Sequence, residues 1–353
     1  MYPEVEINID NIVKNAKLIE KLCGNTRSLT LVTKLLAGNI DIVKEVINKT
    51  EIKDIADSHV SNLKLYKELP VRKWLIREPG ISEIESVIKY VDISFNSELD
   101  TIKALNTEAK RQNKIHNIIL TYELGDLREG CNKEELFKLV EECMKLENVK
   151  IYGIGANLSC FGGIIPTEDN MKELKNVSLE VESKFNIDLT VVSGANTSAM
   201  HMLKDNEIPE EINNIRIGEA ILCGYNTAFS EKVDGFNTDT FKLKAEIVEI
   251  KNKQSIPRGI SLVDAAGNKP EFEDRGIRTR AIIAIGNEDV NIGEIKPVDK
   301  EIVVLGGCSD YTILDITDSK KNYKIGDIVE FNMSYFSILK SMISKYVYKN
   351  IIY

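Results

Sequence analysis

The chain has few histidines and no closely spaced cysteine pairs, and this scarcity argues against a zinc site. Among 353 residues there are three histidines and six cysteines, and no two cysteines form a CxxC pair. Zinc sites draw such ligands together at short, regular spacings. Scattered cysteines are better explained as reduced and mostly buried thiols. The sequence therefore predicts no metal.

Long apolar runs and a signal pattern are also missing. No stretch approaches the roughly twenty apolar residues that span a membrane, and the first residues, MYPEVEINID, lack the basic-then-apolar order of a signal peptide. Acidic residues outnumber basic ones by 55 to 46, so the net charge is −9. This charge disfavours non-specific binding to nucleic acid or to an anionic membrane, and it would suit a cationic substrate. We expect a cytoplasmic protein that binds neither nucleic acid nor membrane.

In the first two-thirds of the chain, short β-type runs alternate with stretches of helical period. Such alternation predicts a parallel sheet with crossover helices, and eight units in about two hundred residues favour a closed (β/α)8 barrel. An open sheet with one miscounted strand is the alternative, although no GxGxxG opens the chain as a dinucleotide-binding unit would. The expected strands are 29–33, 54–56, 74–76, 92–95, 117–122, 150–154, 189–192 and 214–217. The clearest helical stretches are 40–48, 83–90, 98–112, 133–146 and 167–185.

The pattern changes near residue 235, where long helical stretches end. Four β-type runs follow, at 240–250, 280–285, 301–305 and 311–316. They predict a β-rich domain over residues 235–353, after a barrel over residues 1–234. The alternating segment at about 1–10 can pack with the β domain, and 335–348 fits a short helix or a strand.

Lys34 ends the first β-type run, LTLVT, and precedes LLAGN. That placement predicts an amine directed from a strand end into a crowded, largely apolar setting. Burial of a lysine is costly unless the amine is paired or chemically used, and it lowers the pKa toward nucleophilic or Schiff-base chemistry. The alternative is a strand-edge lysine whose amine reaches water.

The segments after the late strands carry anion-binding patterns. Barrel enzymes build their sites at the carboxyl ends of the strands. There, SGANTS (193–198) and RIGEA (216–220) offer backbone N–H groups and hydroxyls to a phosphate. Each also has a structural interpretation, as an ordinary N-cap and as a turn with a surface arginine. Beside Lys34 they predict the lysine and phosphate pocket that pyridoxal 5'-phosphate requires.

Taken in order, the segments VTK, LREG, GANL, GANTS, RIGEA and GGCSDYTILDIT resemble the alanine racemase-type (fold-type III) pyridoxal phosphate enzymes. Within that family, the NL-x-C-x-GG and RIGEA segments are most similar to those of the ornithine racemase branch. The resemblance spans nearly the whole chain. It implies a homodimer whose active sites combine one subunit's barrel with the other's β domain.

The resemblance also implies roles for single residues. Lys34 matches the cofactor lysine, and Arg216 the arginine that faces the pyridine nitrogen, with Glu219 as the rival partner of the ring. Arg128 matches an arginine beside the substrate carboxylate, and Asn157 stands against the cofactor ring. The residues expected to hold the cofactor through its phosphate, from the turn pattern or from the resemblance, are Ser193, Asn196, Thr197, Gly218, the backbone of Glu219 and Tyr335.

The chain departs from alanine racemases at both catalytic tyrosines. Their tyrosine four residues after the lysine is here Gly38, and no tyrosine in a Tyr-Gly context lies in residues 247–282. Alanine as substrate is therefore in doubt and the second base is open. The candidates for it are Asp264, Tyr311 and Cys308, which can instead be turn, strand and core residues. Asp264 or Asp310, the aspartate of the family's Cys-Met-Asp motif, could instead hold a substrate δ-ammonium.

These observations predict a pyridoxal phosphate-dependent racemase of ornithine or a similar basic amino acid. Racemisation by two bases needs an acid/base group on each face of Cα. The alternatives are an alanine or broad-specificity racemase, a decarboxylase of the same fold and a non-catalytic pyridoxal phosphate-binding protein. A barrel without any cofactor is the most distant possibility.

Overall fold

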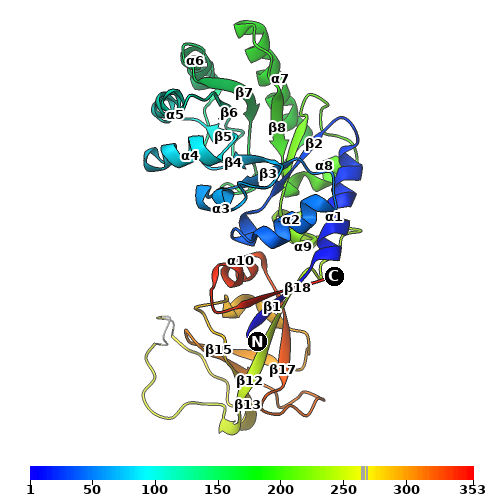
Figure 1. Cartoon of the computed structure of the whole chain (residues 1–353). Helices are drawn as coiled ribbons and strands as arrows, with labels where there is room; N and C mark the ends of the chain where they lie inside the picture. Colours follow the sequence, from blue (N-terminus) through cyan, green and yellow to red (C-terminus); the bar gives the residue numbers. More distant parts are fainter. Residues whose placement is uncertain (264–266, 268) are drawn as a thin grey trace. The chain divides into compact units, whose positions relative to one another are not determined.

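The computed structural model describes residues 1–263, 267 and 269–353. Asp264, one of the candidate second bases, lies outside the described residues. The chain divides into two compact units: Ile12–Thr238, and Met1–Asn11 together with Asp239–Tyr353 (Figure 1). No helix of the described part combines the length and the hydropathy that crossing a membrane requires.

Eight parallel strands close into a barrel in the first unit, which confirms the predicted (β/α)8 class and makes the open sheet wrong. The barrel closes where β9 pairs with β2, with Thr30 opposite Arg216. The strands are β2 (Ser28–Val32), β3 (Asp54–Asp57), β4 (Arg72–Leu75), β5 (Ile93–Asn96), β6 (His116–Thr121), β7 (Val149–Gly155), β8 (Val191–Ala195) and β9 (Asn214–Ile217).

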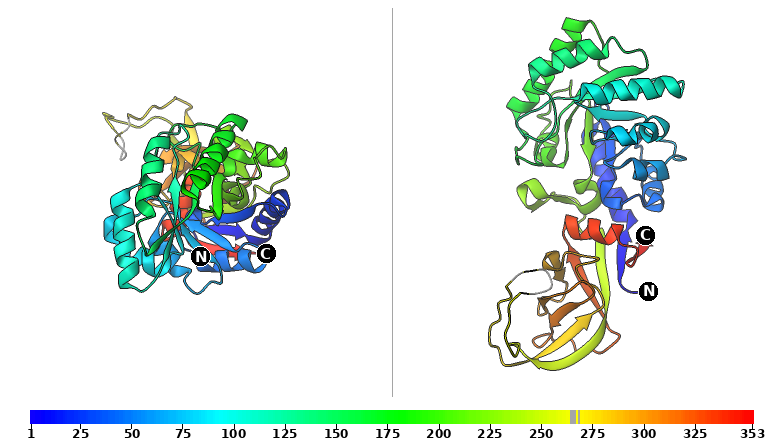
Figure 2. Two further views of the ribbon diagram at one scale, coloured as in Figure 1. Left: turned by 90° about the horizontal axis from the view of Figure 1, so that it is seen from above. Right: turned by 90° about the vertical axis from the view of Figure 1, so that its left-hand side faces the viewer.

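Helices ring these strands (Figures 1 and 2). In α2 the apolar residues recur at helical spacing, so one face is buried, and Asn39 caps its start by accepting a hydrogen bond from the Ile42 N–H at 3.2 Å. The helices of the barrel are α1 (Ile9–Cys23), α2 (Ile40–Asn48), α3 (Val60–Leu65), α4 (Ile84–Tyr90), α5 (Leu99–Arg111), α6 (Lys133–Cys143), α7 (Glu168–Phe185), α8 (Met200–Lys204) and α9 (Glu219–Cys223). Short 3-10 turns are η1 (Lys34–Leu36), η2 (Ile81–Glu83), η3 (Thr197–Ala199) and η4 (Thr227–Phe229), and the two-residue strands β10 (Tyr225–Asn226) and β11 (Glu231–Lys232) follow α9.

The strands pack around an apolar cluster that contains Trp74 and Phe95. Trp74, the one tryptophan, is fully buried, and its indole N–H donates to Asp54 at 2.8 Å. Asp54 also accepts two hydrogen bonds from Arg72, at 2.7 and 2.8 Å. The buried indole N–H of Trp74 therefore has the hydrogen-bond partner that a buried polar group needs.

The second unit is built on an eight-stranded sheet, ordered β14-β17-β12-β13-β16-β15, with β1 and β18 attached through β1 to β12. Alternate residues of β12 are buried in its first half, as the sequence pattern indicated. Residues 335–348, for which the sequence allowed either a helix or a strand, form mainly the helix α10, and the strand β18 follows it. The elements are β1 (Glu4–Asn8), β12 (Phe241–Gln254), β13 (Ile277–Ile283), η5 (Ile292–Glu294), β14 (Ile295–Pro297), β15 (Val303–Gly307), β16 (Thr312–Asp315), β17 (Ile328–Met333), α10 (Tyr335–Ile343) and β18 (Tyr348–Ile352).

Candidate active site

The predicted barrel residues gather at the carboxyl ends of adjacent strands. Lys34 follows β2, Arg216 lies in the neighbouring β9, and Thr197 follows β8. Asn157 and Arg128 come after β7 and β6, which are next around the barrel. All these strands are parallel, so their carboxyl ends form one rim, which is where barrels place their sites.

Lys34 is exposed, so the expectation of a crowded apolar setting was wrong. The strand ends at Val32, and Lys34 opens the 3-10 turn η1, whose buried side chains are Leu35 and Leu36. The turn therefore buries its leucines and leaves the amine accessible. The charge of Lys34 also acts on Glu219: burial raises the pKa of that carboxyl, and Lys34 partly opposes the rise.

Arg216 is buried, with 5% of its surface exposed, so it is not the surface arginine of the structural interpretation. Its Nη2 donates to the Ala156 oxygen at 2.7 Å, and its Nη1 donates to the Ser193 backbone oxygen at 3.0 Å and to the Ser193 hydroxyl. Burial, with the nearby charge of Arg128, lowers the Arg216 pKa to about 10. The guanidinium is therefore fixed to the ends of β7 and β8 and remains charged at neutral pH.

Ser193 is engaged by its neighbours. Its hydroxyl donates to Asn214 at 2.5 Å, and the Asn214 amide donates to Thr30 at 2.9 Å. This buried chain ties β8, β9 and β2 together beneath the rim. In the structure, then, the hydroxyl of Ser193 helps to hold Arg216.

The SGANTS turn has the N-cap that its structural interpretation required. Asn196 caps η3 by accepting from the Ser198 N–H at 2.8 Å, and its own amide donates to the Leu158 oxygen at 2.8 Å. The Thr197 hydroxyl accepts from the Ala220 N–H at 3.3 Å. The loops after β7, β8 and β9 are thus joined side by side.

Gly218 lies at the start of α9, in a space where a side chain would crowd Val32. A Cβ there would come within 3.0 Å of the Val32 Cβ and 3.1 Å of the Val32 oxygen. Beside it, the Glu219 carboxylate accepts from the Thr227 N–H at 3.1 Å and from the Thr227 hydroxyl. A glycine here brings the backbone of α9 close to β2.

Arg128 acts on Arg216 through its charge, and Asn157 follows the neighbouring strand β7. Arg128 is exposed, pairs with Glu129, and is close enough to Arg216 to affect its pKa. The Asn157 amide lies 3.0 Å from the Cys160 thiol. The rim therefore presents two guanidinium groups, one exposed and one buried, together with an exposed amine.

The sequence did not single out Asp126, which organises this rim. Its carboxylate is buried and accepts from the N–H groups of Cys160 and Phe161, at 2.9 to 3.3 Å, and of Ile164 at 3.3 Å. Its backbone oxygen accepts from the Gly162 N–H at 2.9 Å. An acid inside a charged loop carries no signal for such a role, because the partners lie more than thirty residues away.

In the other unit, three predicted residues share one hairpin turn. Cys308, Asp310 and Tyr311 join β15 to β16, and the turn is closed by the Cys308 N–H donating to the Tyr311 oxygen at 2.9 Å. Tyr311 and Asp310 are exposed and Cys308 is half-buried, which is not the core packing of its structural interpretation. Tyr335 opens α10, with its ring edge-on to Phe336.

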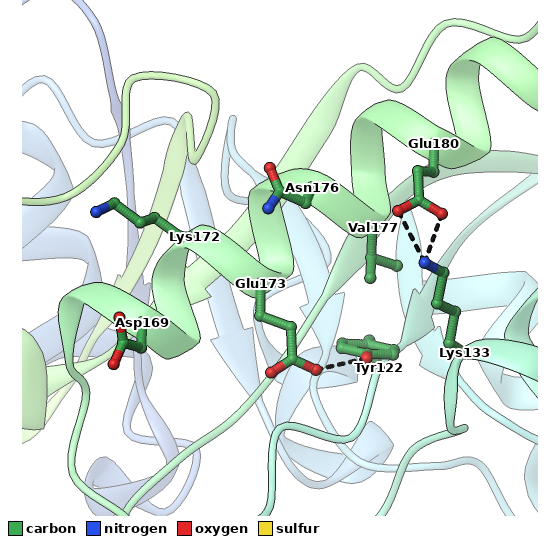
Figure 3. A pocket seen from close by; sticks show the side chains of 8 residues that line it. All are labelled: Tyr122, Lys133, Asp169, Lys172, Glu173, Asn176, Val177 and Glu180. Carbon is green, nitrogen blue, oxygen red and sulfur yellow. Dashed lines mark hydrogen bonds and ion pairs between the residues drawn. The ribbon is translucent and has the colours of Figure 1, made fainter.

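A surface pocket on the outer side of the barrel involves other residues. It lies between Tyr122, the start of α6 and one face of α7 (Figure 3). The Tyr122 hydroxyl donates to Glu173 at 2.6 Å, and Lys133 pairs with Glu180 at 2.6 Å. Lys172, which also lines it, pairs with Glu168 outside the pocket, and none of the predicted site residues is among those that line it.

The fold and the rim define a class: a (β/α)8 barrel joined to a β-rich unit, with a lysine after the first barrel strand. The family described as "Alanine racemase, N-terminal domain" matches residues 7–226. The chain belongs to this family. It is 46% identical to an ornithine racemase of Acetoanaerobium sticklandii over all of both chains. It is 36% identical to a lysine racemase of Thermotoga maritima, over 99% of this chain and 98% of the relative.

A solved structure carries the same fold. The alanine racemase of Bartonella henselae with covalently bound pyridoxal phosphate superposes with a TM-score of 0.73 at 20% identity, covering 99% of each chain.

Proposed function

We propose that this chain is an amino acid racemase that uses pyridoxal 5'-phosphate and acts on ornithine or a similar basic amino acid. The observation that carries the proposal is the exposed Lys34 amine at the end of β2, on the strand paired with the one that holds Arg216. The family and its ornithine- and lysine-specific relatives support it.

The rim residues fit this cofactor. Gly218 lets the start of α9 pack closely against Val32, and the backbone N–H groups at Thr197, Gly218 and Glu219 are the candidates to hold a phosphate. Asn196 caps the turn that carries Thr197, and the family resemblance implies Tyr335 as a further phosphate ligand. When bound, pyridoxal phosphate acts as an electron sink that acidifies the Cα proton of an attached amino acid.

Arg216 is suited to face the pyridine nitrogen, and Asn157 the ring. The guanidinium is held by backbone oxygens and its Nη atoms cannot swing away. A cation at the pyridine nitrogen disfavours protonation there, which favours return of the proton to Cα over transamination. Glu219, the rival partner, has its carboxylate engaged by Thr227.

The proton moves need one group on each face of Cα. The Lys34 amine serves one face. For the other, the hairpin turn of the second unit offers Tyr311 and Cys308, and Asp264 remains a candidate outside the described residues. In a homodimer these groups would come from the partner subunit, as the family implies.

Two groups of the substrate need recognition, its α-carboxylate and its side-chain ammonium. The exposed Arg128 would bind the α-carboxylate. Asp310, exposed in the hairpin turn, or Asp264 would bind the side-chain ammonium. Gly38 removes the tyrosine that alanine racemases carry at this position. A basic substrate also suits the net charge of −9.

One experiment tests the proposal directly. The purified protein is incubated separately with L-ornithine, L-lysine and L-alanine while optical rotation and CO2 are followed, and borohydride then fixes the cofactor for peptide mapping. We expect rotation to be lost with ornithine without CO2 release, and the tag to lie on Lys34. Lys34→Ala should lose tag and activity, whereas Lys44→Ala, at an exposed lysine on α2, should keep both. A tag elsewhere, or CO2 release, would refute the proposal.

A further inference from the structure

A buried polar cluster lies directly beneath the Lys34 turn, and the chemistry described so far makes no use of it. Asp57 ends β3, the strand paired with β2, and is 0% exposed. Thr33, the residue before Lys34, is also fully buried, and so is Tyr66, which follows α3. Buried carboxylates and hydroxyls are costly, so three at one place call for an explanation.

Asp57 holds the residue next to the lysine. Its carboxylate accepts from the Thr33 hydroxyl at 3.0 Å, from the His59 N–H at 3.0 Å and from the Asn62 amide at 3.1 Å. Thr33 caps η1, and its N–H donates to the Ala56 oxygen at 2.7 Å. Both the backbone and the side chain of Thr33 are therefore fixed to the end of β3.

Tyr66 leaves a polar atom unpaired at the same place. Its hydroxyl is buried and lies beside the Thr33 side chain and the Gly38 backbone, which lower its pKa as hydrogen-bond partners do, but it reaches full hydrogen-bond geometry with no described residue. A buried hydroxyl without such a bond destabilises the fold. Burial and the charge of Asp57 both raise the Tyr66 pKa, so the hydroxyl keeps its proton and remains a donor.

Gly38 explains why the Lys34 turn is held by Asp57 and Tyr66 and not by a side chain of its own. It adopts a left-handed φ of +82°, and a Cβ there would lie 2.7 Å from the Leu65 side chain and 3.1 Å from the Asn62 side-chain oxygen. No side chain at residue 38 can therefore hold the lysine from its own turn.

We propose that Asp57 and Tyr66 are positioning residues for Lys34, and that the Tyr66 hydroxyl makes its missing hydrogen bond to the Thr33–Gly38 turn when the Lys34 amine is covalently engaged. The inference rests on the proposed role of Lys34. Asp57 sets the direction of the turn, and Tyr66 stabilises the position that the turn takes with the cofactor attached.

The proposal predicts that Tyr66→Phe affects the stability of the protein and the attachment of pyridoxal phosphate in different ways. Without cofactor, Tyr66→Phe removes an unpaired buried hydroxyl, so the melting temperature should stay equal or rise. With cofactor, the same variant loses a hydrogen bond of about 1 kcal/mol, so attachment of pyridoxal phosphate to Lys34 should weaken roughly five- to tenfold. A tyrosine with only a packing role would leave attachment unchanged.

The test compares wild type, Tyr66→Phe and a matched control. The control is Tyr122→Phe, whose hydroxyl is bonded to Glu173 on the outer side of the barrel (Figure 3). For each protein, the melting temperature is measured without cofactor, and binding is measured by titration with pyridoxal phosphate followed by borohydride and peptide mapping. Tyr122→Phe should melt lower and label Lys34 as wild type does.

Asp57→Asn supplies a second variant. It keeps the volume of the side chain but loses one of the accepting oxygens, so kcat should fall with little change in KM, since Lys34 would be misdirected and Arg128 undisturbed. Wild-type attachment and kcat in both variants would overturn the inference while leaving the proposed function intact. Failure of the wild-type protein to label at Lys34 would overturn both.

Discussion

The guanidinium carbon of Arg216 lies 4.7 Å from the centroid of the Phe95 ring. A cation over an aromatic face is stabilised by the ring's negative charge density, and more so when both are away from water. Among the described residues, the acceptors of Arg216 are neutral oxygens and no carboxylate bonds it. Its pKa of about 10 is the result of this burial, and the arrangement leads to the first prediction.

Arg216→Lys should destabilise the protein and impair racemisation. An ammonium on a flexible stem cannot span the oxygens of Ser193 and Ala156, so at least one buried acceptor loses its donor, at about 1–3 kcal/mol. We also expect more transamination, because the cation is no longer fixed. Urea unfolding and product analysis measure the two effects. Arg128→Lys, at an exposed arginine, should change stability by less than about 0.5 kcal/mol. Equal losses of stability in the two variants would contradict the account.

Gly218→Ala should weaken cofactor binding and stability together. The new Cβ would meet the Val32 Cβ at 3.0 Å and its oxygen at 3.1 Å, and such overpacking costs about 1–3 kcal/mol. Pyridoxal phosphate titration and thermal melting measure both. Gly293→Ala is the control, since open space surrounds that position. A Gly218→Ala protein that binds and melts as wild type would show that the space is not needed.

Asp126→Asn should loosen the loop after β7. An amide offers one accepting oxygen where the carboxylate has two, so some of the N–H groups of residues 160–164 lose their partner, at about 1–3 kcal/mol locally. Limited proteolysis should cut this loop faster, and racemisation should slow. Asp188→Asn, at an exposed loop residue, should do neither. Unchanged cleavage would argue against Asp126 as the anchor.

His116 should make the protein sensitive to acid. Its ring is buried, with Nε2 2.9 Å from the Ser94 hydroxyl, and burial lowers its pKa from 6.5 to about 4. The unfolded chain binds a proton between these values and the native chain does not. Stability is therefore fully present above pH 6.5 and is lost toward pH 4, by on the order of 3 kcal/mol.

His116→Gln removes this titration, so the stability difference between wild type and variant should shrink on acidification from pH 7 to pH 4. Urea unfolding at several pH values measures it. His201→Gln, at an exposed ring, should track wild type throughout. A constant difference for His116→Gln would mean that the folded and unfolded chains protonate this ring with the same pKa.

The sequence was sufficient for the barrel because its signals are local. The helix over 40–48 was predicted with the bounds that the structure shows, since a cap and a 3.6-residue apolar period coincide there. The sequence did not indicate α1. It starts directly after β1, at Ile9, and the alternating apolar residues of the strand run into it without a polar turn.

The sequence likewise indicated one part of the candidate site and not another. Lys34, Arg216 and the SGANTS turn are visible in the sequence, because each follows a strand and strand ends of a barrel meet at one rim. The burial of these residues was not visible. Lys34 is exposed, which agrees with its alternative interpretation, and Arg216 is buried, which excludes the surface arginine of the structural interpretation.

The amino-acid sequence by itself determined the strand–helix order, the closed barrel and the residue types on its rim, because periodicity and turn chemistry act over a few neighbouring residues. Only the tertiary structure decided which acids hold the rim together. Asp57 accepts a hydrogen bond from Thr33, 24 residues away, and Asp126 accepts one from the Cys160 N–H, 34 residues away. Contacts at such separations depend on how strands pair around the barrel, and no local pattern encodes them.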